Sequence, residues 1–123
     1  ELRELKMENI EKSTYGKEGF QLGNNIAESA TLTASDAVEA GTVLIRSSGK
    51  NWVPATASTL VAGAGIGIAI APVASGSNVP CDVSIGGRFN RKFVKVEGVE
   101  VTDAQCDILR GQGIFALTLN PID

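Results

Sequence analysis

The sequence predicts a small, mainly β domain of short strands and hairpins, with one short helix near residues 102–111 and an extended N-terminal arm. The chain of 123 residues is 43% hydrophobic but only 5% aromatic, so its core consists of Val, Ile, Leu and Ala. Its 14 glycines favour turns and short strands over long helices. The length allows one domain, which we place at residues 19–123, after an arm of residues 1–18.

The central feature is a charge-free run, residues 51–81, that contains the alternating segment GIGIAI. Alternation of Ile with Gly or Ala is typical of a strand with its large side chains on one face. Its small face allows another backbone to approach closely.

A run without charge must be buried in a core, inserted in a bilayer or packed against another chain. A spanning helix needs about 20 apolar residues, and the apolar stretch here, residues 60–74, is shorter and carries several glycines and Pro72. We therefore expect a buried strand and no membrane association.

The first 18 residues, ELRELKMENIEKSTYGKE, mix charges of both signs and make a poor amphipathic helix. We expect an arm that becomes ordered on a partner, with its apolar side chains as anchors. A solvated tail without a role is the alternative. The side chains that we expect to anchor the chain on this partner are Leu2, Leu5, Met7, Ile10, Tyr15, Phe20 and Leu22.

The first half of the domain predicts a strand and a hairpin. Residues 28–33 favour a strand with Ala30 and Leu32 on one face, followed by a loop or helical turn. In the hairpin, residues 43–45 lead into a turn at 47–50, and the chain returns at Trp52. Trp52 is the only tryptophan and is expected to fill the core or rim, with a ligand-stacking platform as the alternative.

After the GIGIAI strand we expect a turn at 75–80 and a strand at 81–85 with Cys81, Val83 and Ile85 on one face. Gly86 and Gly87 break or bulge this strand. Two further short strands, at 93–96 and 99–101, flank a tight turn at Glu97 and Gly98.

One helix is predicted between residues 102 and 111. Thr102 as N-cap and Gln105 three residues later form a capping box, and Val101 and Cys106 occupy the staple positions. Ile108 and Leu109 supply the buried face, and Gly111 or Gly113 ends the helix. A last strand is expected at 114–119, before Pro121.

The residue types argue against catalysis. The chain has no His, which removes the commonest acid–base group and metal ligand. Cys81 and Cys106 are each followed by Asp, whereas a reactive thiolate needs positive surroundings. Buried free thiols are expected, with one intramolecular disulfide as the alternative. The glycines of GAGIG lack the spacing of a dinucleotide loop. We expect no enzyme activity, no catalytic residue, no metal and no cofactor.

The charge pattern limits the partners. A net charge of −3 and a pI near 5.0 argue against direct binding of nucleic acid. The one basic cluster, Arg88, Arg91 and Lys92, is either solvated or in contact with an acidic protein surface. The chain shows no basic-then-apolar signal sequence, so we expect synthesis in a cytoplasm.

Four segments, taken in order, resemble the head decoration proteins of tailed bacteriophages, lambda type. They are AGTVLIRSSGKNWVPATAS, the Gly/Ala strand, VPCDVSIGGRFN and VTDAQCDILRGQGIFAL. In that family a GTVL strand leads to a G-K-aromatic-V-P hairpin, a GI strand, a D-V strand with a G-R-like turn, and a short T-x-x-Q helix ending in GI. The resemblance covers roughly residues 20–119, whereas residues 1–17 depart from the family pattern.

The resemblance implies a barrel- or tulip-like β fold and a structural virion protein made in the host cytoplasm. It implies homotrimers on the outside of the expanded capsid, at threefold or quasi-threefold positions. There they clamp neighbouring major capsid subunits against internal DNA pressure. We expect Trp52, Arg88 and Arg91 to make trimer or shell contacts. The alternatives are a head-fibre base or capsid-borne host-surface binding module, and a carrier-type β domain with a modified lysine, for which Lys50 lacks suitable flanking residues.

Overall fold

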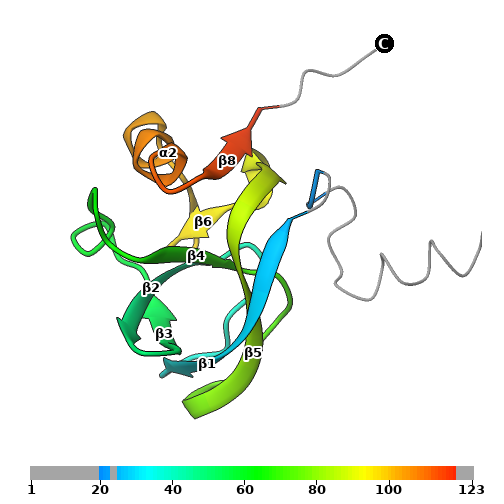
Figure 1. The fold of residues 1–123 in the computed structure, drawn as a ribbon, viewed down its shortest axis with the longest axis vertical. Coiled ribbons are helices and arrows are strands. Elements are labelled where there is room, and N and C mark those ends of the chain that lie inside the picture. Colours follow the sequence, from blue (N-terminus) through cyan, green and yellow to red (C-terminus); the bar gives the residue numbers. More distant parts are fainter. Residues whose placement is uncertain (1–19, 23–24, 119–123) are drawn as a thin grey trace, which may run out of the picture.

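The structure is a computed structural model that describes residues 20–22 and 25–118. Its main unit is a small closed barrel of five strands, which confirms the mainly β prediction (Figure 1). The strands lie in the order β1-β3-β2-β4-β5, and β1 pairs with β5 to close the barrel. Their bounds are β1 Ile26–Ala34, β2 Val43–Ser48, β3 Asn51–Pro54, β4 Ile66–Ala69 and β5 Gly76–Asn90.

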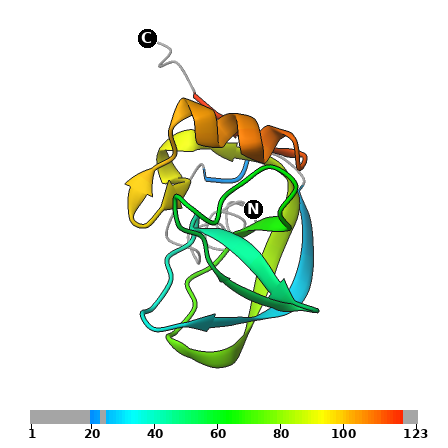
Figure 2. The same cartoon turned by 90° about the vertical axis from the view of Figure 1, so that its left-hand side faces the viewer.

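A second layer lies across one end of the barrel (Figure 2). It contains η1 (Arg91–Phe93), β6 (Lys95–Val96), β7 (Val99–Glu100), α2 (Asp103–Arg110) and β8 (Ile114–Leu117). The 15-residue β5 joins the two layers, because its N-terminal portion pairs with β1 and its last residues, 87–90, pair in parallel with β8. No helix in the described ranges is long and apolar enough to cross a bilayer.

Strand β5 corrects two predictions. The turn expected at 75–80 is wrong, because residues from Gly76 onward pair with β1 along its whole length. Of the break or bulge predicted at Gly86 and Gly87, the bulge is confirmed: the register shifts between the pairs Ile26–Gly86 and Ala27–Ser84, which leaves Ile85 as an extra residue. This bulge breaks the alternation, so Ile85 is 36% exposed whereas Val83 is fully buried.

The hairpin of β2 and β3 is confirmed, but its turn is shorter than predicted. Strand β2 continues to Ser48, and Gly49 and Lys50 alone make the connection. Gly49 has a φ of 55°, the left-handed conformation that two-residue hairpin turns require. The tight turn after β6 is also confirmed, with positive φ at both Glu97 and Gly98.

The barrel interior explains the GIGIAI segment. Gly67 and Ala69 of β4 face inward, where Trp52 lies among Leu32, Leu44 and Val83. The small face therefore receives the Trp52 indole rather than another backbone, and β4 is buried within its own chain. The large side chains of β4, Ile66 and Ile68, point to the opposite side and join a second core.

The second core fills the space between the barrel and the upper layer. Ile68 packs there with Leu109 of α2, Ile114 of β8 and the Phe20 and Phe89 rings. The two rings lie 5.1 Å apart between centroids. Burying side chains from both layers in one cluster makes barrel and upper layer a single domain.

The predicted helix is confirmed with its capping box. The Gln105 backbone N–H donates to Thr102 Oγ1 (3.2 Å), and the Thr102 N–H donates to Gln105 Oε1 (2.9 Å). The strand expected at 93–96 is shorter, because Asn90 caps a 3₁₀ turn at residues 91–93 and leaves only Lys95–Val96 extended. The last strand ends at Leu117 rather than at 119, a position outside the described residues.

Candidate functional site

The described residues hold free thiols but no metal-binding cluster. Within residues 20–22 and 25–118, no group of three or more Cys, Asp and Glu side chains is placed to hold a metal ion. Cys106 is buried and Cys81 is half-buried, and both are free, as predicted. Burial raises the pKa of both thiols, and Asp82 adds to the effect at Cys81. Both groups therefore stay protonated at neutral pH, in the unreactive form.

An open groove of about 560 Å³ lies between the loop after β1, residues 54–56 and the β6–β7 hairpin. Its charged residues are Asp36, Glu39, Lys95 and Glu97. Glu97 Oε1 accepts a hydrogen bond from the Ala57 N–H (3.2 Å) and so ties the β3–β4 loop to the hairpin. Its hydroxyl side chains are Ser35, Thr42 and Thr56, and the Thr42 hydroxyl donates to Glu39 O (2.8 Å).

Phe20, expected to anchor the arm on a partner, belongs instead to the domain core. It is 2% exposed and packs against Phe89 and Phe93. Residues 20–22 also pair with the end of β5: the Asn90 N–H donates to Phe20 O (2.8 Å) and the Leu22 N–H donates to Arg88 O (3.0 Å). Leu22 is half-buried. The other expected anchors, Leu2, Leu5, Met7, Ile10 and Tyr15, lie outside the described residues.

Two side-chain hydrogen bonds of Asn25 also hold residues 20–22 and 25 beside β5. Its Oδ1 accepts a hydrogen bond from the Arg88 N–H (2.9 Å), and its amide donates to Gln21 Oε1 (3.1 Å). Gly87, with a φ of 132°, makes room for this contact, since any side chain there would collide with the Asn25 amide. Gly87 therefore leaves space for the Asn25 side chain, a role that the sequence pattern did not reveal. Residues 20–22 and 25 are therefore held beside residues 88–90 of β5.

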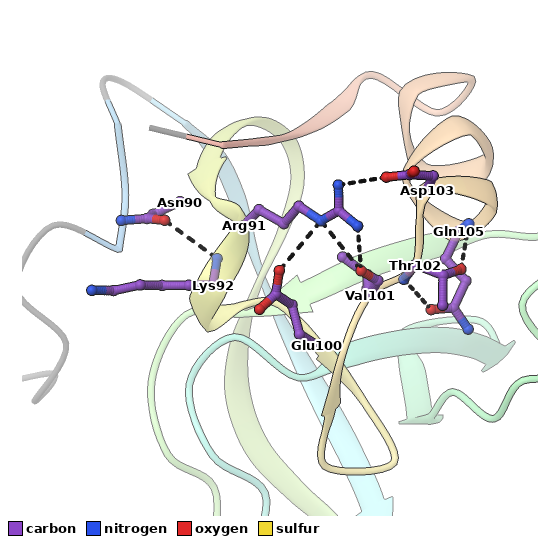
Figure 3. A network of polar contacts seen from close by, with 8 residues as sticks. All are labelled: Asn90, Arg91, Lys92, Glu100, Val101, Thr102, Asp103 and Gln105. Carbon is purple, nitrogen blue, oxygen red and sulfur yellow. Dashed lines mark hydrogen bonds and ion pairs between the residues drawn. The ribbon is translucent and has the colours of Figure 1, made fainter. Parts of the chain in front are cut away.

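Arg91 is held by its own chain (Figure 3). Its Nη1 contacts Asp103 Oδ1 (2.7 Å), its Nε lies 3.4 Å from Glu100 Oε2, and its Nη2 donates to Val101 O (2.9 Å). The hydrogen bond to Asp103 raises the pKa of Arg91 above its ordinary value. This network joins η1 to β7 and to the start of α2. Of the predicted basic cluster, Arg88 and Lys92 are the exposed members.

Trp52 does not make the expected trimer or shell contact. Its side chain is 1% exposed inside the barrel, which also excludes a ligand-stacking surface. The Arg46 guanidinium lies 5.7 Å from its ring centroid. The Trp52 Nε1–H is buried without a hydrogen-bond partner among the described residues. The signal in the sequence was Gly67, since a small residue on one strand makes room for a large one across the barrel.

Sequence reasoning missed a surface at β8. Phe115 is half-buried there, directly opposite Arg88 in the register of β8 and β5. The Arg110 guanidinium lies 5.4 Å from the centroid of the same ring. Phe115 thus has an exposed arginine of α2 beside its ring, and an exposed arginine of β5 as its register partner.

Comparison with known proteins adds no relative: no protein-family model matches the chain, and no curated protein matches its sequence.

Proposed function

We propose that this protein is a structural decoration protein of a tailed-phage virion. It binds the outside of the expanded capsid as a homotrimer at threefold or quasi-threefold positions and clamps neighbouring major capsid subunits. The main support is the fixed entry of the chain into the domain. Phe20 is buried and Asn25 is tied to β5, so the preceding residues are tethered to a well-defined point on the domain.

The order of the folded elements also supports the proposal. The segments that resemble the decoration family form, in chain order, the β2–β3 hairpin, β4, the long β5 and the capped helix α2. A small closed barrel has few free edges, which suits a protein that must remain monomeric or trimeric at high concentration.

Avidity, ordering on binding and linkage explain how such a protein would stabilise the shell. A trimer presents three N-terminal segments at once, so weak single contacts combine through avidity. A segment that orders on its partner loses entropy but can reach across a subunit boundary. A protein that binds the expanded shell and not its precursor stabilises the expanded shell through linkage.

The test is co-sedimentation of the purified protein with empty expanded heads and with unexpanded precursor heads, at several salt concentrations. We expect saturable binding to expanded heads and little binding to the precursor. Sedimentation of the free protein should show three chains, or a monomer that trimerises on the shell. Failure to bind expanded heads, or a stable dimer in solution, would refute the proposal.

A further inference from the structure

The open groove beside the loop after β1 is lined by small apolar side chains and by an excess of acidic ones. Its volume of about 560 Å³ lies within the range of pockets that hold a small ligand, about 300–1,000 Å³. It can therefore take one large side chain together with the adjacent backbone. Among the described lining residues, the small apolar ones include Ala34, Ala37 and Ala55, the acidic ones are Asp36, Glu39 and Glu97, and the basic one is Lys95. This excess of carboxylates favours an occupant with positive charge.

The described part of the chain begins next to this groove. A Cβ at Gly41 would lie 3.5 Å from the ring of Phe20, the first described residue. Gly41 sits between Ala40 and Thr42, which both line the groove. The N–H of a third lining residue, Lys95, donates a hydrogen bond to Gly41 O (3.0 Å). The buried Phe20 side chain therefore fixes the start of the domain beside one wall of the groove.

The residues that precede Phe20 match the charge of the groove over one short stretch. Residues 12–17, KSTYGK, carry two lysines and no acidic side chain, whereas residues 1–11 hold four acidic and two basic side chains. An extended chain spans about 3.3–3.6 Å per residue, so the backbone of Lys17 cannot lie more than about 11 Å from that of Phe20. Of the segments outside the described ranges, residues 12–17 are thus the one that combines positive charge with closeness to the groove.

We propose that residues 12–17 of the same chain occupy the groove, with Tyr15 packed against its small apolar side chains and with Lys12 and Lys17 paired with its carboxylates. Exposed ion pairs are individually weak, but only two residues connect this segment to Phe20. So short a tether gives the segment a high effective concentration at the groove, which allows weak contacts to hold it there.

This inference goes beyond the decoration function and does not depend on it. Tyr15 then serves its own domain, as Phe20 does, and not a partner. Residues 1–11 leave the domain at the groove, which gives the remaining expected anchors of the arm a defined point of origin. These anchors are Leu2, Leu5, Met7 and Ile10.

The experiment is NMR spectroscopy of the isotope-labelled full-length protein. Tyr15 is the only tyrosine, so its ring signals identify the segment without ambiguity. We expect nuclear Overhauser effects between the Tyr15 ring and the methyl groups of Ala37 and Ala55. Contacts of the ring with none of the lining residues of the groove would overturn the proposal.

The role of charge is tested with two double variants of the arm. Lys12→Gln with Lys17→Gln should lower the ratio of docked to undocked segment by about threefold or more, because two ion pairs are lost. The matched control, Arg3→Gln with Lys6→Gln, removes the same charge from the arm outside the segment and should leave the ratio unchanged. Equal ratios in the two variants would refute the pairing of the lysines with the groove.

The groove side is tested in the same way. Asp36→Asn should also lower the docked fraction, whereas Asp82→Asn, at an exposed position of β5 outside the groove lining, should not. Unchanged amide signals of the barrel strands would show that the variants keep the fold. A sample that mixes labelled and unlabelled chains identifies the source of the segment. Contacts between the Tyr15 ring of one chain and the groove of another would assign the groove to a second copy and overturn the inference.

Discussion

Gly67 lies directly against the indole of Trp52: a Cβ at position 67 would lie 3.0 Å from Cζ3 and 3.1 Å from Cη2. Such a Cβ would also collide with Val83 Cγ1 on the neighbouring strand. The lone tryptophan and the small face of the GIGIAI segment are thus two halves of one packing arrangement. Gly65, two residues earlier in the alternation, makes room in the same way for the Arg46 side chain, which lies over it.

Replacing Gly67 with Ala should destabilise the fold by about 1–3 kcal/mol, because the added methyl group overpacks the barrel interior. The measurement is the free energy of unfolding in urea. Gly86→Ala is the matched control, since a Cβ there would meet its nearest atoms at 3.6 Å, an ordinary contact. Equal losses in the two variants would show that Gly67 is not required for packing against Trp52.

Two variants of Trp52 distinguish the stabilisation that comes from filling the barrel from the effect of the buried indole N–H. Trp52→Ala should cost about 3–5 kcal/mol through the cavity it leaves. Trp52→Phe should cost clearly less, because it also removes the buried Nε1–H, which has no partner among the described residues. Chemical denaturation of both variants gives the comparison. A Phe variant as unstable as the Ala variant would mean that the indole N–H contributes favourably to the folded state.

Removal of Arg91 should loosen the segment that leads into α2. We expect Arg91→Gln to speed hydrogen exchange of the backbone amides in residues 99–105, because Glu100, Val101 and Asp103 lose their common partner. Lys92→Gln, a neighbouring exposed cation, is the control. Unchanged exchange in the Arg91 variant would show that the capping box holds this segment without help.

The thiols should make the protein less stable at high pH. Their pKa is raised by burial above the ordinary value of 9.0, so the unfolded chain loses these protons before the folded protein does. The folded state then binds more protons than the unfolded state, and stability falls as pH rises through about 9. Unfolding free energies between pH 8 and 10 should decline more steeply in the wild type than in a variant with Cys81→Ala and Cys106→Ala. Parallel declines would contradict this expectation.

The N-terminal arm should be needed for binding to heads, whereas Phe20 should be needed for the stability of the domain. Deletion of residues 1–18 is expected to leave a folded trimer that no longer binds expanded heads, and full binding would refute the arm hypothesis. Phe20→Ala should instead cost about 3–5 kcal/mol in stability, because the ring is buried against Phe89. Thermal unfolding and head co-sedimentation of both variants provide the two measurements.

The sequence by itself determined the elements whose causes are local. The capping box of Thr102 and Gln105, the two-residue turn at Glu97 and Gly98, and the alternation of β4 each depend on residues within a few positions of one another. Their conformations follow from side-chain hydrogen bonds, left-handed backbone geometry and strand periodicity, all of which are visible in a short stretch of sequence.

Only the tertiary structure decided which partner each element meets. It closed β1 on β5, carried β5 through the expected turn, placed Trp52 inside the barrel rather than at a surface, and turned Arg91 toward its own chain. It also brought Phe115 of β8 into register with Arg88 of β5 and beside the guanidinium of Arg110 of α2. These outcomes depend on contacts between residues distant in the chain, and no local pattern specifies which apolar face or which charged side chain will be its neighbour.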